Sequence, residues 1–214
     1  MDFGLCMVTT RDANDVMYGF TEAEKHGFTF VGLWDSPYNF MEIYPYLGIA
    51  AMNTKTVQLG SFVTNPLTRH PSVTAAAMAT IDNLSEGRAV LGLGRGDSAV
   101  KMLGWHPASW KDYEQSIHDI RNWMRGNSVD LEDAPGPVTL SWADREVPIA
   151  ISLFGPRGAR LAGRLGDIAT TECAELGAVK WMNENVQASA KKAGRDPIDF
   201  EVSIGAYVSD DMAK

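Results

Sequence analysis

The chain has 214 residues, a formal net charge of −8 and two cysteines, Cys6 and Cys173, which stand far apart in the sequence. This length suits one α/β domain with a sizeable core, and the acidic charge disfavours a nucleic acid as the main partner. The cysteine spacing indicates neither a disulfide framework nor a zinc site, so we expect no metal and a reducing, cytoplasmic setting.

Short apolar runs alternate with helical patterns along the whole chain. The predicted strands cover residues 3–8, 29–34, 57–64, 89–93, 148–153, 167–171 and 200–208. The predicted helices cover residues 13–26, 43–53, 72–84, 110–125, 157–164 and 179–193. Such alternation predicts right-handed βαβ units and a parallel sheet. No apolar run reaches the ~18 residues of a membrane span, and the chain start lacks the features of a signal peptide, so we expect no membrane partner.

A doubly wound sheet and a barrel both satisfy this alternation. The glycine-rich stretch follows the fourth predicted strand rather than the first, which counts against a Rossmann domain and favours a (β/α)8 TIM barrel. The chain ends on residues 209–214, which look like the cap and first turn of another helix. We therefore expect a single barrel domain over residues 1–214, truncated after about seven strands, with an irregular loop at residues 127–144. Apolar flanks at its open edges predict self-association, hence a homo-oligomer.

The predicted strands end in residues that could carry chemistry. Asp35 and Ser36 follow the second strand, where Asp35 could also be a helix cap or a turn residue. Gly60 within the third strand and Pro66 after it indicate a bulge at the barrel rim. His70 precedes Pro71, where capping or packing against the next helix is the commoner role.

Two turns are rich in glycine. The stretch "GLGRGDSAV" at residues 92–100 places three glycines on alternate positions and then the carboxylate of Asp97. Glycine lets a ligand approach the backbone closely, so this turn suggests a cofactor seat. The turn at residues 154–158 opens a helix, and its free N–H groups, together with Arg157, could bind an anion.

Four long, collinear segments carry a resemblance to a known family. They read "EKHGFTFVGLWDS", "EIYPYLGIAAMNTKTVQLGSFVTNPLTRHP", "ATIDNLSEGRAVLGLGRGDSAVKMLG" and "GPRGARLAGRLGD". In these segments the chain resembles the bacterial luciferase-like superfamily of flavin and deazaflavin oxidoreductases. It is most similar to the branch of the methylenetetrahydromethanopterin reductases, which use the deazaflavin coenzyme F420. Members that use flavin mononucleotide (FMN) share the same scaffold.

The resemblance implies positions around the cofactor. In the deazaflavin reductases a non-prolyl cis peptide bond in the third strand makes a bulge behind the tricyclic ring, and the aligned bond here joins Phe62 and Val63. The ring edge and the ribityl phosphate would be held by Asp35, Ser36, Thr64, Asn65, Gly94, Arg95, Gly96, Asp97, Ser98, Gly155, Pro156, Arg157 and Gly158. The chain departs from the family where Ser36 replaces a frequent histidine and Cys6 replaces a glutamate of the methylene reductases.

The implied activity is hydride transfer between F420 and a small organic substrate. Asp97 would act as proton donor or charge stabiliser, and Asp35 would orient its surroundings. Candidates for the substrate pocket are Trp34, Tyr38, Phe62 and Trp105, although each could equally belong to the core. Two alternatives stay open: an FMN-dependent monooxygenase of the same superfamily, and a barrel or fragment that binds the coenzyme without catalysis.

Overall fold

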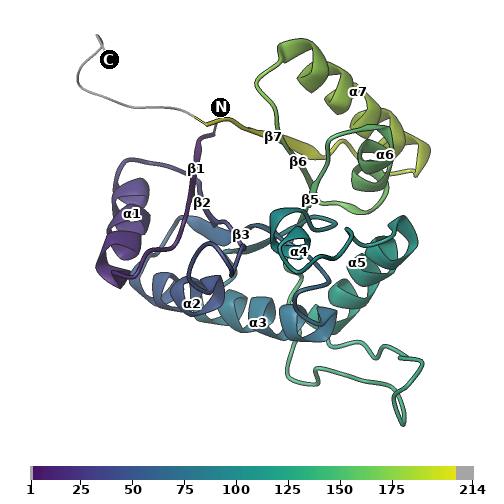
Figure 1. Ribbon diagram of the computed structural model, residues 1–214, viewed down its shortest axis with the longest axis horizontal. Helices are drawn as coiled ribbons and strands as arrows, with labels where there is room; N and C mark the ends of the chain where they lie inside the picture. The colour runs from purple at the N-terminus through teal and green to yellow at the C-terminus, as the bar shows by residue number, and fades with distance from the viewer. Residues whose placement is uncertain (1, 206–214) are drawn as a thin grey trace.

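The computed structural model describes residues 2–205, in which seven strands alternate with helices along the chain (Figure 1). The strands are β1 Gly4–Met7, β2 Phe30–Leu33, β3 Gln58–Thr64, β4 Ala89–Leu93, β5 Ile149–Ser152, β6 Ile168–Glu172 and β7 Asp199–Ser203. The helices are α1 Ala13–Lys25, α2 Ile43–Asn53, α3 Pro71–Leu84, α4 Ser98–Lys101, α5 Trp110–Met124, α6 Pro156–Leu165 and α7 Leu176–Lys192.

All neighbouring strands pair in parallel, in the order β1-β2-β3-β4-β5-β6-β7. The strands form a nearly closed barrel with the helices outside it, so the predicted fold class is confirmed (Figure 1). The edge strands β1 and β7 approach each other, since the side chains of Cys6 and Ser203 meet across the opening. Parallel strands end at one rim, and the turns after β2 to β5 therefore share the same mouth of the barrel.

Most element bounds differ from the predicted ones by one to three residues, and two differences are larger. The four-residue helix α4 was not predicted, because a single helical turn shows no hydrophobic period. Strand β7 ends at Ser203, earlier than predicted. The predicted end of that strand at residues 206–208 and the predicted helix start at residues 209–214 lie outside the described residues.

The barrel has two apolar layers. A large core fills the space between the strands and the surrounding helices. A small inner cluster of Phe30, Val90 and Ala150, with Phe62 and Ile168 packed against it, lies within the barrel. Inner and outer layers follow from the alternation of side chains along each strand.

Strands β3 and β4 approach each other unusually closely. A Cβ atom on Gly60 would lie 1.8 Å from the carbonyl oxygen of Val90, and one on Gly92 would lie 2.2 Å from that of Ser61. The two positions require glycine because backbone stands where a side chain would begin. The first glycine of the "GLGRGDSAV" stretch is therefore explained by strand packing.

Residues 127–144 leave the barrel as a protruding segment between α5 and β5 (Figure 1). One antiparallel bridge joins Val129 to Val138, and the indole Nε1–H of Trp123 donates to the carbonyl of Val138 at 2.9 Å. The segment is thus tied to α5 at its base. Across residues 2–205, no helix is both long and apolar enough to cross a membrane.

Candidate functional site at the barrel mouth

Asp35 lies just after β2 and is buried, with 1% of its side chain exposed. Its Oδ2 atom accepts a hydrogen bond of 2.5 Å from the Thr64 hydroxyl of β3 and lies 3.3 Å from Nη1 of Arg69. Its Oδ1 atom is buried and finds no partner among the described residues. Asp35 therefore ties the end of β2 to the end of β3.

Arg69 is the second partner of this carboxylate. Its Nη2 atom donates to Glu42 at 2.6 Å, and its guanidinium lies 4.3 Å from the ring centroid of Tyr44. Burial acts to lower the pKa of Arg69, but the surrounding Tyr44, Asp35 and Glu42 hold the pKa above its usual value. Burial, with Asp35 adding to it, raises the pKa of Tyr44 to about 12. Arg69 was not predicted as a site residue, because its place in the loop after β3 was its only signal in the sequence.

The end of β3 carries the implied bulge. The peptide bond between Phe62 and Val63 is cis, as the resemblance implied. The pairing register with β4 shifts between Ser61 and Thr64, which marks the irregularity expected from Gly60 and Pro66. Beyond the strand, Asn65 Oδ1 accepts from the backbone N–H groups of Leu67 and Thr68, so its side chain shapes the following loop.

The end of β4 lies directly against this bulge. The N–H of Gly94 donates to the carbonyl of Thr64 at 2.8 Å, and a Cβ atom on Gly94 would lie 3.0 Å from Cγ2 of Val63. Gly96 has a φ of 96°, a backbone conformation that favours glycine. Arg95 points away from the strand end, with its Nε donating to Ala108 and its guanidinium over the Trp110 ring.

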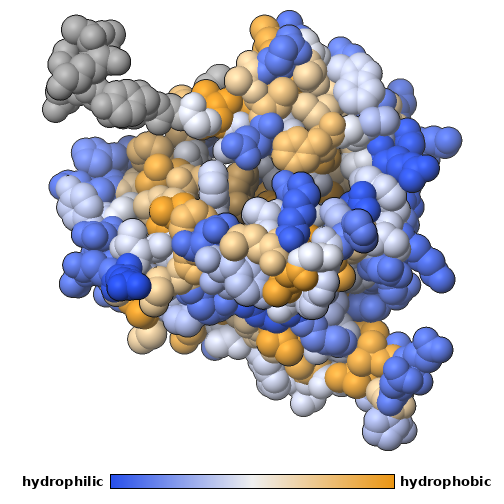
Figure 2. Space-filling view, viewed as in Figure 1, coloured by the Kyte–Doolittle hydropathy of each residue, from blue (hydrophilic) through white to orange (hydrophobic). Residues whose placement is uncertain are grey.

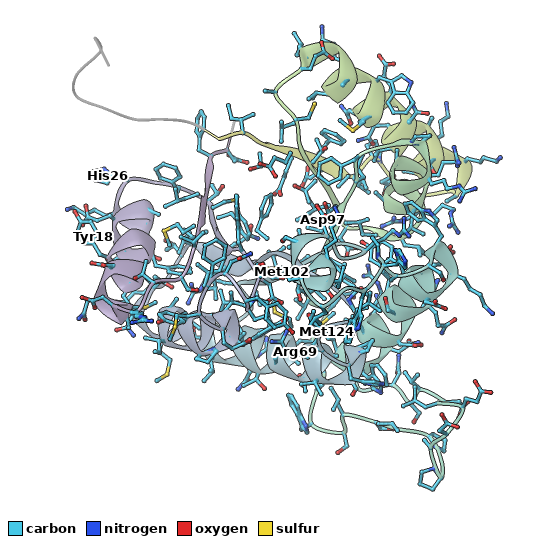
Figure 3. The ribbon with its side chains drawn as sticks, in the orientation of Figure 1. Tyr18, His26, Arg69, Asp97, Met102 and Met124 are labelled. Atoms are coloured by element: carbon cyan, nitrogen blue, oxygen red, sulfur yellow. The ribbon has the colours of Figure 1, made fainter. Side chains whose placement is uncertain are left out.

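Asp97 stands at the start of α4, near the centre of the view in Figure 3. It occupies the N-cap position, yet its side chain makes no capping hydrogen bond. The side chain is 77% exposed and forms an ion pair with Lys101 one turn further along. The next residue, Ser98, places its hydroxyl 3.4 Å from that of Ser36, which joins the ends of β2 and β4.

The turn after β5 leads into α6 without a side-chain cap. Gly155 is at the N-cap position, Pro156 follows in the first turn, and Arg157 is exposed. A Cβ atom on Gly158 would lie 2.9 Å from Cβ of Leu153, so this glycine serves packing. Arg157 also lines a cleft of about 410 Å³ on the outer side of α5, α6 and α7.

Aromatic side chains surround the same mouth. The residues Trp34, Tyr38 and Trp105 are 40%, 49% and 50% exposed, so they are not core residues, whereas Phe62 is half-buried. Phe154, two residues after the end of β5, is 71% exposed and was not predicted, although its place after a strand was the same signal. The space-filling view is hollowed near its centre, with polar and apolar side chains around the hollow (Figure 2).

The predicted residues thus form one connected group, from the ends of β2, β3 and β4, and a separate turn after β5. Contacts join Asp35 to Thr64 and Ser36 to Ser98, and Gly94 packs on Val63. The turn at residues 155–158 contributes a helix N-terminus at the same rim. His70 caps α3, accepting from the N–H of Ser72, as expected. Among residues 2–205 no cluster of three or more His, Cys, Asp or Glu side chains is arranged to hold a metal ion.

Comparison with known proteins identifies the family. The family model of the luciferase-like monooxygenases matches residues 1–213. The chain belongs to this family. It is 33% identical over 97% of its length to a 5,10-methylenetetrahydromethanopterin reductase of Methanolobus tindarius, and it covers 64% of that relative. It is 32% identical to an F420-dependent glucose-6-phosphate dehydrogenase of Beutenbergia cavernae over 78% of the chain and 53% of the relative.

A solved structure agrees with the fold. The F420-dependent tetrahydromethanopterin reductase of Methanopyrus kandleri superposes with a TM-score of 0.80 over 94% of this chain and 65% of that one, at 23% identity. The chain therefore spans between 53% and 65% of the length of these relatives.

Proposed function

We propose that this chain transfers a hydride between coenzyme F420 and a small organic substrate at the mouth of its barrel. The proposal is supported by the family and by relatives whose names state F420-dependent reduction or dehydrogenation.

One observation carries the proposal: an uncapped helix N-terminus and several exposed aromatic rings share one rim. The N-terminus of α6, with Arg157 beside it, offers free N–H groups and a positive charge to a phosphate. Exposed Trp34, Trp105 and Phe154 offer apolar faces to a planar ring. These features fit a cofactor that has a flat tricyclic ring at one end and an anionic chain at the other.

Different residues of the mouth would contact different parts of such a cofactor. F420 supplies the hydride-carrying carbon. The Phe62–Val63 bulge and the bare backbone at Gly94 would support the ring, while Asp35 holds the Thr64 hydroxyl in place at its edge. The exposed carboxylate of Asp97 would hold or deliver the proton that accompanies reduction, and the aromatic residues would exclude water.

We also propose that the barrel is one domain that self-associates. Exposed apolar side chains flank the edge strands: Phe3, just before β1, is 63% exposed, and Ile204, just after β7, is 61% exposed. Exposed apolar side chains beside unpaired strand edges favour association. Light scattering of the purified chain tests this: a mass that is a multiple of 23.4 kDa is expected, and a stable monomer contradicts it.

Titration of the protein with F420 and with FMN tests the cofactor. We expect F420 to bind at least ~10-fold more tightly, a difference of about 1.4 kcal/mol. Tighter FMN binding together with oxygen-dependent turnover would move the assignment to the monooxygenase alternative. Binding of F420 without turnover of any carbonyl or imine substrate would support the binding-only alternative.

Two arginines on α6 provide a matched pair for this titration. Arg157→Gln is expected to weaken F420 binding by roughly 5–10-fold, because a charge-assisted contact to phosphate is lost. Arg160→Gln removes a charge that is also exposed but lies about one turn further from the helix start. We expect less than about a twofold effect, since such charge effects fall off beyond the first turn. Equal effects would show that the helix start is not the phosphate site.

A further inference from the structure

The charged residues of the barrel strands gather on one wall. The seven strands contain three carboxylates, Glu172, Asp199 and Glu201, and no lysine, arginine or histidine. All three carboxylates lie on the adjacent strands β6 and β7. Since charged residues within strands are otherwise absent here, this concentration needs a reason.

These carboxylates face the inside of the barrel. Ile168 of β6 packs against the inner cluster, and alternation therefore points Thr170 and Glu172 inward as well. The register pairs Ile168 with Asp199, Thr170 with Glu201 and Glu172 with Ser203, so that the same face of β7 is inward. The intervening Thr171 turns outward, with its hydroxyl 3.7 Å from the sulfur of Met182 on α7.

Two further side chains complete the inner wall. Cys6 of β1 reaches it from across the barrel opening, where burial, together with the Glu201 and Glu172 carboxylates, raises the pKa of its thiol to about 12. Thr170 is 1% exposed, and its hydroxyl has no hydrogen-bond partner among the described residues. Buried hydroxyls are normally paired, so an unpaired one that points into the lumen indicates a ligand there.

The opposite wall has a different character. Its inward positions on β2, β3 and β4 include Gly32, Gly60 and Gly92, which carry no side chain. Above them lies the Phe62–Val63 bulge, where the proposed cofactor ring would rest. A ring on that side leaves the wall of β6, β7 and β1 for the substrate.

We infer that the acidic wall formed by Thr170, Glu172, Glu201, Ser203 and Cys6 binds the substrate through a cationic or N–H- and O–H-rich group and repels anions. Its identification as the substrate side rests on the proposed function. Glu201 is half-buried and Glu172 is exposed at the end of β6, so the wall presents two carboxylates towards the barrel mouth. Carboxylates gathered on one wall attract cationic and donor groups and disfavour a phosphate or carboxylate. The substrate class thus differs from a sugar phosphate of the kind named for the Beutenbergia cavernae relative.

Cys6 provides a reporter for the charge of this wall. In a Cys173→Ser background, the labelling rates of Cys6 by a cationic trimethylammonium-ethyl and an anionic sulfonatoethyl methanethiosulfonate are measured at one pH. The rate with the cationic reagent is divided by the rate with the anionic reagent, and this ratio is then divided by the corresponding ratio for the free thiol 2-mercaptoethanol, which removes the intrinsic difference between the two reagents. We expect a normalised ratio above ~10, as nearby charges change encounter rates by about that factor or more.

Substitutions on the wall and outside it sharpen the measurement. Glu201→Gln is expected to lower the normalised ratio at least ~3-fold, because it removes one negative charge beside Cys6. Glu201→Asp keeps the charge and should keep the ratio of the parent protein. The Asp variant also tests the role of the charge if the Gln variant does not fold. Glu184→Gln removes the same charge from the exposed side of α7 and should leave the ratio unchanged. A normalised ratio near one in the parent protein, or an equal drop in Glu184→Gln, overturns the inference.

Protection of Cys6 tests binding itself. Labelling by neutral iodoacetamide is expected to slow in the presence of butylammonium but not of butyrate, and Glu201→Gln should abolish the protection. Equal or better protection by butyrate overturns the inference. Both labelling measurements are made without cofactor and are therefore independent of the F420 titration. If F420 fails to bind, the proposed function is refuted. If F420 binds but the normalised labelling ratio of Cys6 is near one, only the inference of an acidic substrate wall is refuted.

Discussion

Asp35 and Asp97 follow β2 and β4, the two strands on either side of β3, yet their surroundings are opposite. The side chain of Asp35 is 1% exposed and bound to Thr64 and Arg69. The side chain of Asp97 is 77% exposed, and within residues 2–205 its ion-pair partner is the exposed Lys101. The same residue type at the same rim of the barrel therefore has two different environments.

This difference in exposure indicates a structural role for Asp35 and a ligand-contacting role for Asp97. A buried carboxylate with two fixed partners holds the strand ends and the loop after β3 together, and it has little freedom to meet a substrate. An exposed carboxylate that fails to cap its own helix is free to meet a ligand at the mouth. We therefore expect loss of Asp35 to appear as a loss of stability and loss of Asp97 as a loss of turnover.

The largest expected effect is that of Asp35→Ala. It leaves the guanidinium of Arg69 partly buried with only Glu42 as an ion-pair partner, and we expect the free energy of unfolding to fall by about 2–4 kcal/mol. Urea denaturation measures this. The control Glu42→Gln removes the half-exposed partner of the same guanidinium and should cost less than about 1 kcal/mol. Equal losses would mean that Asp35 is not the anchor of the cluster.

The second prediction concerns Asp97→Asn, once a substrate is found. We expect turnover to fall ~100-fold, the scale of one acid-base group, with F420 affinity and stability unchanged. Turnover within about twofold of the parent would leave Asp97 without a chemical role.

Asp12 supplies the control for a capping role of Asp97. Asp12 caps α1 by accepting from the N–H of Asn14, so Asp12→Ala should cost about 1 kcal/mol of stability. Asp97→Ala should cost less than about 0.5 kcal/mol, because no capping hydrogen bond is lost. A similar cost for both variants would show that Asp97 stabilises α4 in solution.

The third prediction tests why the turn before Asp97 contains glycine. Gly96 has a φ of 96°, and a Cβ atom there would lie 2.9 Å from Val100. Gly96→Ala should therefore cost about 1–2 kcal/mol of unfolding free energy. The same change at Gly48, in the interior of α2 with open space around it, should stabilise the protein by up to about 1 kcal/mol. Chemical denaturation measures the unfolding free energy of both variants. A change of the same sign in the two would contradict the backbone strain assigned to Gly96.

Much of this architecture could be predicted from the sequence. Apolar strand runs between amphipathic helices gave all seven strands, because hydrophobic periodicity is a local signal. The bulge at Phe62–Val63 followed from the family resemblance, and the residues after β2, β3 and β4 do meet at one mouth. Their roles as cofactor ligands stay predictions.

Features that depend on distant contacts could not be predicted. The need for glycine at positions 60 and 92 arises from the close approach of two backbones, which no local pattern shows. Arg69 joins the Asp35 cluster from a loop without periodicity. The acidic inner wall combines β6, β7 and Cys6 of β1, and only the closing of the barrel brings Glu201 and Cys6 together.

The smallest expected effect concerns Glu201, a third carboxylate, which lies between the extremes of Asp35 and Asp97. Burial, with Asp199 adding to it, raises the pKa of Glu201. The folded protein therefore binds this proton more tightly than the unfolded chain does, and the protein loses stability as the pH rises through the range in which glutamate ionises.

Glutamine at position 201 does not titrate, so Glu201→Gln should be more stable than the parent at pH 7, by roughly 1–3 °C in Tm. The difference should shrink towards zero below about pH 4, where the parent carboxyl is also neutral. Calorimetry over this pH range measures it, with Glu184→Gln on the outer face as the control that should show no such trend. A difference that does not change with pH would mean that Glu201 remains as well hydrated in the folded protein as in the unfolded chain, and it would then be an exposed carboxylate like Asp97.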